Sequence, residues 1–132
     1  MGIPSMAISL ATFINPDFHY SAKVGAYLTK VLYKNRLPNG TFLNVNVPPK
    51  TRHQIKGIKI TRQGKIPIHG SFQKRIDPNL RDYYWMTSNP PVNKNDLNID
   101  TYALNQNYVT VTPIHCDLTD HYAIKQMSHW AL

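Results

Sequence analysis

The stretch that decides the fold is Ser5-Met6-Ala7-Ile8-Ser9-Leu10, near the start of a chain of 132 residues. Its apolar residues fall on both faces of an extended segment, which is typical of a strand buried in a parallel sheet. A helix is predicted after it, from Asn15-Pro16-Asp17 to about Asn35, because apolar side chains recur there at helical spacing. We expect Asn15 to cap this helix and Pro16 to be its first residue.

A second strand is predicted from Phe42 to Val47, where apolar and polar residues alternate. Three apolar side chains share one face, and Asn44 and Asn46 share the other. A strand, a helix and a strand at this spacing predict a parallel βαβ unit. We also expect the first strand to be covered on both faces and paired on both edges, which would bury Met6, Ile8 and Leu10.

The sequence changes character after Pro48-Pro49, where turns and short aromatic segments replace the long periodic ones. A strand that ends at Pro113 and a final helix that runs to Trp130 close the pattern. In order, we predict a strand around Ile58 and Ile60, short strands at Ile66-Pro67-Ile68 and Tyr83-Tyr84-Trp85, an exposed loop from Asn89 to Asn98, a strand from Tyr108 to Thr112, and a helix capped within Asp117-Leu118-Thr119-Asp120.

Composition indicates a globular domain, because 42% of the residues are hydrophobic and 17% are charged. The single cysteine, Cys116, excludes an internal disulfide. The longest apolar run, from Ile3 to Ile14, is too short to span a membrane, and the first basic residue, Lys23, comes too late for a signal peptide. We therefore expect a soluble cytoplasmic protein that does not contact a membrane.

The net charge of +8 is concentrated between Lys50 and Arg75, which hold eight of the fifteen basic residues and no acid. This stretch is either a phosphate-attracting patch for nucleotide or nucleic acid, or the solvated face of an extended β segment. No recognition helix, RNA-binding aromatic motif or zinc finger accompanies it, so the solvated face is favoured and nucleic acid is the less favoured partner. Tyr83-Tyr84-Trp85 could stack a base, but packing explains such a run more often.

One segment near the C-terminus gathers five potential metal ligands within seven residues. Imidazole, thiolate and carboxylate groups together could bind zinc or manganese. The segment lies where a strand becomes a helix, so we expect its side chains to point in different directions, with Asp117 and Thr119 acting as capping groups. The five candidates are His115, Cys116, Asp117, Asp120 and His121.

Several segments together resemble the SurE family of metal-dependent nucleotidases. The resemblance runs from one end of the chain to the other and covers about the C-terminal half of that family. It is carried by Gly2-Ile3-Pro4-Ser5, Ala7-Ile8-Ser9-Leu10, Leu43-Asn44-Val45-Asn46-Val47-Pro48, Thr61-Arg62-Gln63-Gly64, Asp77-Pro78, Tyr83-Tyr84-Trp85, Asp100 with Ala103-Leu104, Tyr108-Val109-Thr110-Val111-Thr112-Pro113 and Asp117-Leu118-Thr119-Asp120.

The resemblance implies a hydrolase, a 5′-nucleotidase that removes phosphate from nucleoside 5′- and 3′-monophosphates with magnesium or manganese. Its metal ligands are two adjacent Asp, a Ser and an Asn, and a Ser-Gly-Thr phosphate loop follows. All of these precede the motif that matches Gly2-Ile3-Pro4-Ser5. The resemblance therefore assigns no catalytic and no metal-ligating residue to this chain, and the substrate-binding residues stay unknown.

The same resemblance implies an α/β architecture, the C-terminal part of a Rossmann-like three-layer fold. Residues 1–60 would complete the Rossmann-like layers, 61–112 would form a β-rich oligomerisation extension, and 113–132 would form a C-terminal helix. A homo-oligomer, dimer or tetramer, or pairing with an N-terminal half is expected. His115, Cys116 and His121 fall outside the family's ligand set.

Three functions stay open at this point. The first is a nucleotidase whose chain is truncated or split and inactive alone. The first strand supports this reading. If it lacks neighbouring strands, Met6, Ile8 and Leu10 are exposed, which costs roughly 5–9 kcal/mol, whereas the net stability of a domain is about 5–15 kcal/mol. The second is a non-catalytic oligomerisation module. The third is a nucleic-acid binder that uses the segment from Lys50 to Arg75.

Overall fold

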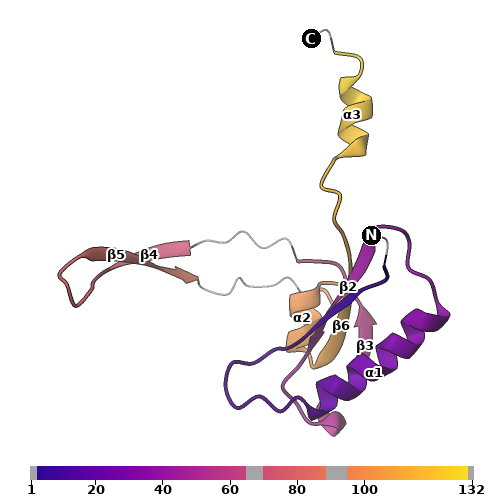
Figure 1. The fold of residues 1–132 in the computed structure, drawn as a ribbon, viewed down its shortest axis with the longest axis horizontal. Helices are drawn as coiled ribbons and strands as arrows, with labels where there is room; N and C mark the ends of the chain where they lie inside the picture. The colour runs from indigo at the N-terminus through magenta and orange to yellow at the C-terminus, as the bar shows by residue number, and fades with distance from the viewer. Residues whose placement is uncertain (1–2, 65–69, 89–94, 131–132) are drawn as a thin grey trace.

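The computed structural model describes residues 3–64, 70–88 and 95–130. Its main body is a four-stranded sheet in the order β1-β2-β6-β3 (Figure 1). The strands are β1 (Met6–Leu10), β2 (Thr41–Val47), β3 (Gly57–Ile60) and β6 (Tyr108–His115). Strands β1 and β2 are parallel, as are β3 and β6, whereas β2 and β6 are antiparallel.

The predicted βαβ unit is confirmed. Helix α1 (His19–Lys34) connects β1 to β2, and these strands pair in parallel with Ile8 opposite Val45. The expected alternation in β2 also holds, because Leu43, Val45 and Val47 are buried while the asparagines between them are half-buried. The α/β fold class predicted from the sequence is therefore correct.

The start of α1 differs from the prediction by three residues. Asn15 has a φ of +46°, so its backbone is left-handed and does not cap the helix. Helix α1 begins at His19, whose backbone N–H donates to Oδ1 of Asp17 at 2.9 Å. A carboxylate that accepts from a free N–H at a helix start replaces the asparagine cap that we expected.

Strand β6 continues through Pro113 to His115, two residues beyond the expected end at the proline. Pro113 lies opposite Leu43, whose backbone N–H donates instead to the Ser5 carbonyl of the segment leading into β1. Leu43 and Pro113 therefore form a pair without mutual hydrogen bonds. Proline has no backbone N–H, and at position 113 such a group would point away from β2. Strand β6 is no longer paired with β3 there, because their last pair is Ile60 with Val111. The sheet therefore loses no hydrogen bond at Pro113.

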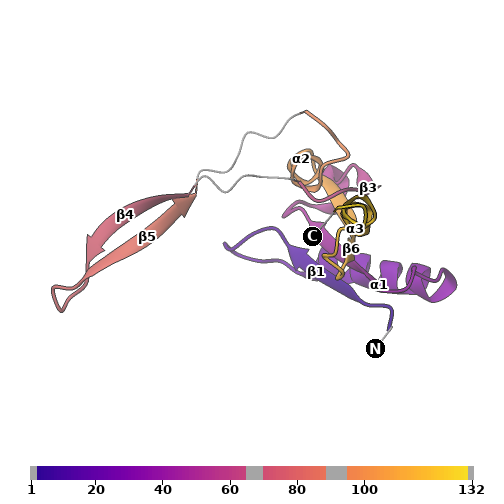
Figure 2. The same ribbon diagram turned by 90° about the horizontal axis from the view of Figure 1, so that it is seen from above.

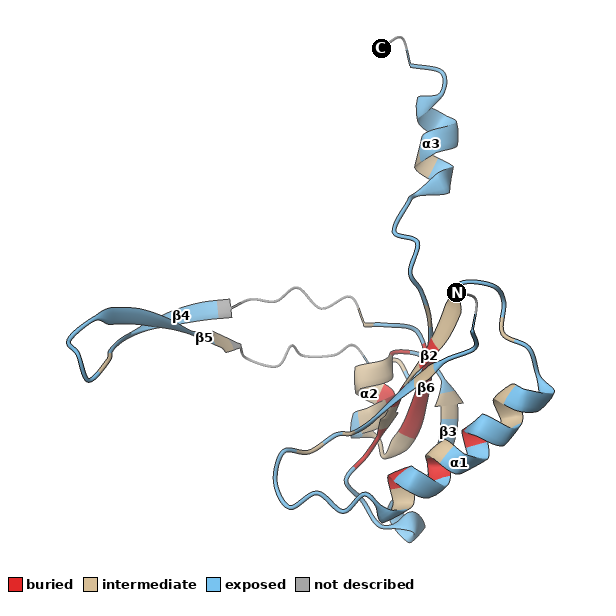
Figure 3. Ribbon diagram, viewed as in Figure 1, coloured by how far each residue is buried: buried red, intermediate tan, exposed pale blue. Residues whose placement is uncertain are grey.

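The core lies between α1 and one face of the sheet. Figure 3 shows the buried residues gathered along β2, β6 and the inner side of α1. Apolar side chains from the two central strands pack there against α1 and the segment before β3. This cluster contains Val24, Leu28, Leu43, Val45, Val47, Ile55, Val109 and Val111.

Two threonines of β6 lie buried on the opposite face of the sheet. Thr112 is hydrogen-bonded through its hydroxyl to the hydroxyl of Thr61 at 2.8 Å. Within the described residues, the hydroxyl of Thr110 is fully buried without a hydrogen-bond partner. An unpartnered buried hydroxyl costs folding free energy, whereas a partnered one contributes to it.

These two positions offer a matched test of that difference. Thr110→Val removes an unpaired hydroxyl at constant shape, so the free energy of unfolding should rise by about 1 kcal/mol. Thr112→Val removes the partner of the buried Thr61, so unfolding should become easier by about 1–2 kcal/mol. Urea denaturation followed by circular dichroism measures both changes. Equal effects of the two substitutions would contradict this account of the buried face.

The first strand is not enclosed as we expected. Strand β1 lies at the edge of the sheet and pairs only with β2 among the described residues. Its central residue Ile8 is 39% exposed, and only Met6 and Leu10 are half-buried. The physical reason is that nothing in the described part of the chain supplies a further strand on this side.

The remaining elements are short and lie outside the main sheet. Strands β4 (Gly70–Ile76) and β5 (Asp82–Ser88) form an antiparallel hairpin that extends away from the body (Figure 2). Helix α2 (Asp100–Asn105) packs on β6, and α3 (His121–Met127) follows it with no buried residue. The strand expected at Ile66-Pro67-Ile68 and the first part of the loop expected from Asn89 lie outside the described residues.

Candidate functional site

A cleft among the described residues opens at the carboxyl edge of the parallel strands β1 and β2. Leu10 ends β1, Val47 ends β2, and both line the cleft together with the residues that follow them. Ligands of open α/β sheets bind at this edge. The cleft has a volume of about 1020 Å³, at the upper end of what small-molecule sites offer.

Three basic side chains from different elements meet at this cleft. Lys23 comes from the second turn of α1, and Lys50 and Arg52 come from the segment after β2. None of the three forms an ion pair with a carboxylate in the parts of the chain that the structure describes. Asp17 is the one acid that lines the cleft, and its Oδ1 is already occupied by the His19 N–H.

Arg52 is held in place by local structure. It is the first residue of a 3₁₀ turn, Arg52–Gln54, in which the backbone N–H of Thr51 donates to Oε1 of Gln54 at 3.2 Å. The guanidinium carbon of Arg52 lies 5.9 Å from the ring centroid of Tyr20, within the range of a cation–π contact. The site thus combines positive charge with an aromatic ring.

The rest of the basic stretch from Lys50 to Arg75 is divided among separate contacts. Within the described residues, its members beyond Arg52 lie against aromatic rings or pair with acids. Lys56 and Lys59 lie over the ring of Tyr108, Arg62 pairs with Asp96, Lys74 pairs with Asp82, and Arg75 lies over Trp85.

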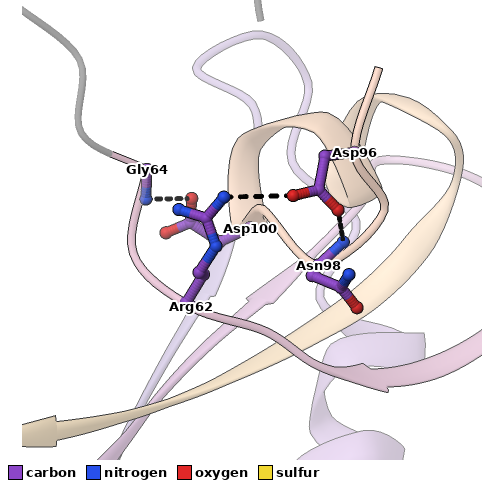
Figure 4. A network of polar contacts seen from close by, with 5 residues as sticks. All are labelled: Arg62, Gly64, Asp96, Asn98 and Asp100. Atoms are coloured by element: carbon purple, nitrogen blue, oxygen red, sulfur yellow. Dashed lines mark hydrogen bonds and ion pairs between the residues drawn. The ribbon is translucent and has the colours of Figure 1, made fainter. Parts of the chain in front are cut away.

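Arg62 belongs to a polar network that joins the segment after β3 to the residues around the start of α2 (Figure 4). It donates to Asp96 at 3.0 Å, and the backbone N–H of Gly64 donates to Asp100 at 3.0 Å. The backbone N–H of Asn98, together with the Arg62 guanidinium, lowers the pKa of the Asp96 carboxyl. This network ties the segment after β3 to the segment before α2, so the residues Thr61-Arg62-Gln63-Gly64 serve as scaffold.

The five candidate metal ligands near the C-terminus do not form a cluster. Asp120 caps α3 by accepting from the Ala123 N–H at 2.9 Å, and Asp117 accepts from the Thr119 N–H at 2.8 Å. Asp117 also contacts Nε2 of His121 at 2.7 Å. The capping role expected of Asp117 and Thr119 falls to Asp120, because the helix begins at the next residue. His115 belongs to β6, and Cys116 is exposed with a free thiol.

The Asp117–His121 contact gives a titration that can be checked. The His121 side chain, followed by the hydroxyl and backbone N–H of Thr119, lowers the pKa of Asp117 from 3.8 to about 2. Because the shift is downward, the stabilisation that depends on the ionised Asp117 carboxylate is present above pH 3.8 and is lost as the pH falls toward 2. Carboxyl ¹³C NMR should record a midpoint near pH 2, and His121→Ala should raise it. An unchanged midpoint in that variant would refute the pairing.

Within the described residues, no group of three or more His, Cys, Asp or Glu side chains is close enough together to hold a metal ion. The donors present therefore do not fit the divalent metal that the family resemblance implies.

Tyr84 and Trp85 are exposed on the hairpin, where Arg75 lies 5.3 Å from the centroid of the Trp85 ring. No helix among the described residues is long and apolar enough to cross a membrane.

Comparison with known proteins identifies the family of this chain. Residues 1–69, just over half of the chain, match the family described as "Survival protein SurE". The chain belongs to the SurE family. A "5′-nucleotidase SurE" from Syntrophobacter fumaroxidans is 40% identical over 132 residues, which cover 100% of this chain and 53% of that protein. Another, from Christiangramia forsetii, is 42% identical over 133 residues, which cover 99% of this chain and 51% of its own length.

A solved structure agrees with the sequence comparisons. The SurE protein of Aquifex aeolicus superposes with a TM-score of 0.80 at 37% identity, over 97% of this chain and 52% of that one. The chain thus spans about half the length of the curated SurE relatives it matches, as the resemblance to a C-terminal half predicted. The SurE fold is accordingly present here in part.

The cleft is the feature that the sequence analysis missed. Its residues come from the loop after β1, the start of α1 and the segment from Val47 to Ile58, so no single motif contains them. A usable signal was present, because ligands bind at the carboxyl ends of parallel strands and Lys50 and Arg52 follow one such strand directly. The sequence analysis treated the stretch from Lys50 to Arg75 as one basic segment, so it did not separate these two residues from the six other basic residues.

Proposed function

We propose that this chain is the C-terminal half of a metal-dependent nucleoside monophosphate phosphohydrolase and is inactive until the other half joins it. The observation that carries the proposal is the end-to-end alignment, at 40% identity, with half of a protein named 5′-nucleotidase SurE. The substrate class and the requirement for magnesium or manganese come to this chain from the family. Cytoplasmic location is part of the same proposal.

The metal site belongs to the other half in this proposal. The described residues of this chain do not provide a ligand cluster. The family resemblance places the ligands before the part that this chain matches. We therefore derive no catalytic step through a metal on these residues. The role we assign to this chain is the second half of the sheet and the cleft at its carboxyl edge.

The open edge of β1 is the surface where we expect the other half to join. A groove of about 700 Å³ runs between β1 and α1. Small residues of α1, among them Ala22, Gly25 and Ala26, line one side of it, and Ile8 lines the other. An exposed edge strand with apolar residues is a template for another strand. The length of the relatives, about twice that of this chain, supplies a partner of the required size.

Phosphate release from adenosine 5′-monophosphate by the purified chain tests the proposal directly. With manganese or magnesium present, the chain alone should release no phosphate beyond the control that contains a chelator. Robust release that the chelator abolishes would overturn the proposal that this half is inactive alone. It would then direct attention to His115, Asp117, Asp120 and His121 as metal ligands.

A second candidate function is an assembly module, and the hairpin favours it. Phe72 and Met86 face each other on one side of β4 and β5 and are 69% and 58% exposed, while Trp85 on the other side is 55% exposed. A two-stranded hairpin is marginally stable in water alone, so these side chains need cover. In this proposal the hairpin is the oligomerisation part of residues 61–112, residues 1–60 form the Rossmann-like part, and residues 113–132 contain the C-terminal helix α3 after the end of β6. Stable self-association in the presence of a chelator, measured by analytical ultracentrifugation, is the expected result.

Strand β6 refines this division of the chain. It begins within residues 61–112 but pairs with β2 and β3 in the main sheet. The projecting part of the proposed extension is therefore the hairpin from Gly70 to Ser88. Nucleic-acid binding through Lys50 to Arg75 is the weakest of the three functions, because three of the described basic residues beyond Arg52 already contact aromatic rings and the other two pair with acids.

A further inference from the structure

We propose that the open edge of β1 pairs with the same edge of a second copy of this chain when the other half is not bound. The two β1 strands run antiparallel about a two-fold axis at Ile8 and join the two four-stranded sheets into one continuous sheet. This inference goes beyond the proposed function, because it needs neither metal nor substrate. Its surface is also separate from the hairpin, on which the second candidate function depends.

The backbone of β1 is the first argument. Its hydrogen bonds to β2 come from odd-numbered residues, such as Ala11, whose N–H donates to the Val47 carbonyl at 2.9 Å. Since backbone groups of successive residues point to opposite sides of a strand, those of Met6, Ile8 and Leu10 face the open edge. In an antiparallel pair, two facing residues of this kind exchange both of their N–H···O bonds. The edge therefore offers a second copy a complete set of donors and acceptors.

The order of side chains in β1 is the second argument. A two-fold contact uses the same surface on both copies, so that surface must complement itself. The strand Met6–Leu10 reads the same in both directions by size, because a large apolar residue, a small one, Ile8, a small one and a large apolar residue follow in turn. Antiparallel pairing about Ile8 places Met6 opposite Leu10 of the second copy. Apolar pairs across strands stabilise a sheet.

The side chain of Ile8 is the third argument. It is 39% exposed and lies on the face that α1 covers, where a Cβ added to Gly25 would be 3.6 Å from its Cδ1. The groove beside it is lined on the helix side by small residues, among them Ala22 and Ala26, which leave room at the edge. A two-fold axis perpendicular to the sheet keeps both copies of α1 on one face. Each Ile8 therefore covers the other beneath the two helices.

The charge at this edge is the fourth argument. The chain carries a net charge of +8, so two copies repel each other unless they meet at a neutral surface. None of the described residues that line the groove is charged. Strand β3, at the other edge of the sheet, contains Lys59, and a lysine on an edge strand opposes pairing with another chain. The sequence of β1 contains neither lysine nor proline, so β1 is the edge that favours a second copy.

Sedimentation equilibrium of the full chain in EDTA tests the proposal. Every sample carries Phe72→Ser and Met86→Ser, which remove exposed apolar side chains of the hairpin, so any dimer comes from another surface. This background chain should dimerise. Ile8→Lys places two ammonium groups next to the two-fold axis and should raise the Kd of the dimer roughly a hundredfold. Ile60→Lys is the matched control: it makes the same change at an exposed isoleucine of the other edge strand and should change the Kd by less than about twofold.

Hydrogen exchange followed by NMR distinguishes strand pairing from other contacts. In the background chain the Ile8 amide should exchange more slowly as the protein concentration rises, whereas the Ala7 amide, which faces β2, should change little. Circular dichroism of each variant shows whether its fold is intact. If Ile8→Lys does not fold, the exchange of the Ile8 amide decides the question without that variant.

Three results would overturn the proposal: a background chain that stays monomeric up to about 1 mM, a Kd raised equally by Ile8→Lys and Ile60→Lys, or an Ile8 amide whose exchange does not depend on concentration. The test uses neither the other half nor a substrate, so its failure is separate from failure of the proposed function. A chain that stays monomeric but supports hydrolysis with the other half refutes only the dimer.

Discussion

Mixing this chain with the half of the Aquifex aeolicus SurE protein that precedes the matched region should produce metal-dependent release of phosphate from adenosine 5′-monophosphate. Either part alone should release phosphate no faster than the buffer control. The mixture should release it roughly a thousand times faster than that control. The physical reason is that a bound metal contributes several kcal/mol of transition-state stabilisation, and each 1.36 kcal/mol is a factor of ten in rate. A phosphate-release assay with manganese, with and without EDTA, measures this increase.

A single polypeptide that joins the two halves controls for weak association. Its activity should equal or exceed that of the mixture, because linkage raises the effective concentration of each half. Lys30→Ala in this chain should leave activity unchanged, since Lys30 lies on the exposed face of α1 away from the cleft and the edge. A joined chain that folds but releases no phosphate would contradict the proposed function.

Ile8→Pro should weaken the pairing of the two halves by roughly a hundredfold. The Ser5 carbonyl accepts from the Leu43 N–H, and the Ala11 N–H donates to the Val47 carbonyl, so odd-numbered backbone groups of β1 face β2. The N–H of Ile8 therefore faces the open edge, where an added strand needs it. Proline removes that donor and places its ring at the edge, for a combined loss of about 3 kcal/mol. Size-exclusion chromatography and isothermal titration of the two halves measure the loss.

The same substitution leaves the β1–β2 ladder intact, since proline is tolerated on an edge strand where its N–H faces outward. Ile8→Ala is the matched control, because it removes the side chain and keeps the N–H, and it should weaken pairing less than tenfold. Hydrolysis by the mixture should fall in parallel with pairing. Equal effects of the two variants would show that the edge backbone takes no part.

The βαβ unit could be predicted from the sequence because its signals are local and periodic. The alternation from Phe42 to Val47 and the helical spacing after Asp17 follow from which side chains must leave water. The end of β6 could not be read in this way. Pro113 is a stop signal within a strand, but its effect depends on which neighbour its missing N–H would have faced, and that neighbour comes from a distant part of the chain.

The sequence by itself determined the α/β class, the parallel pairing of β1 with β2 and, through its motifs, membership of the SurE family. Those conclusions depend on hydrophobic periodicity and on residue order, which are properties of a linear chain. The tertiary structure alone decided that β1 has an open edge and that Lys23 lines the same cleft as Lys50 and Arg52. These features arise from contacts between distant segments. The sequence alone does not show whether folding will place a basic side chain against an acid, against an aromatic ring or at the wall of a cleft.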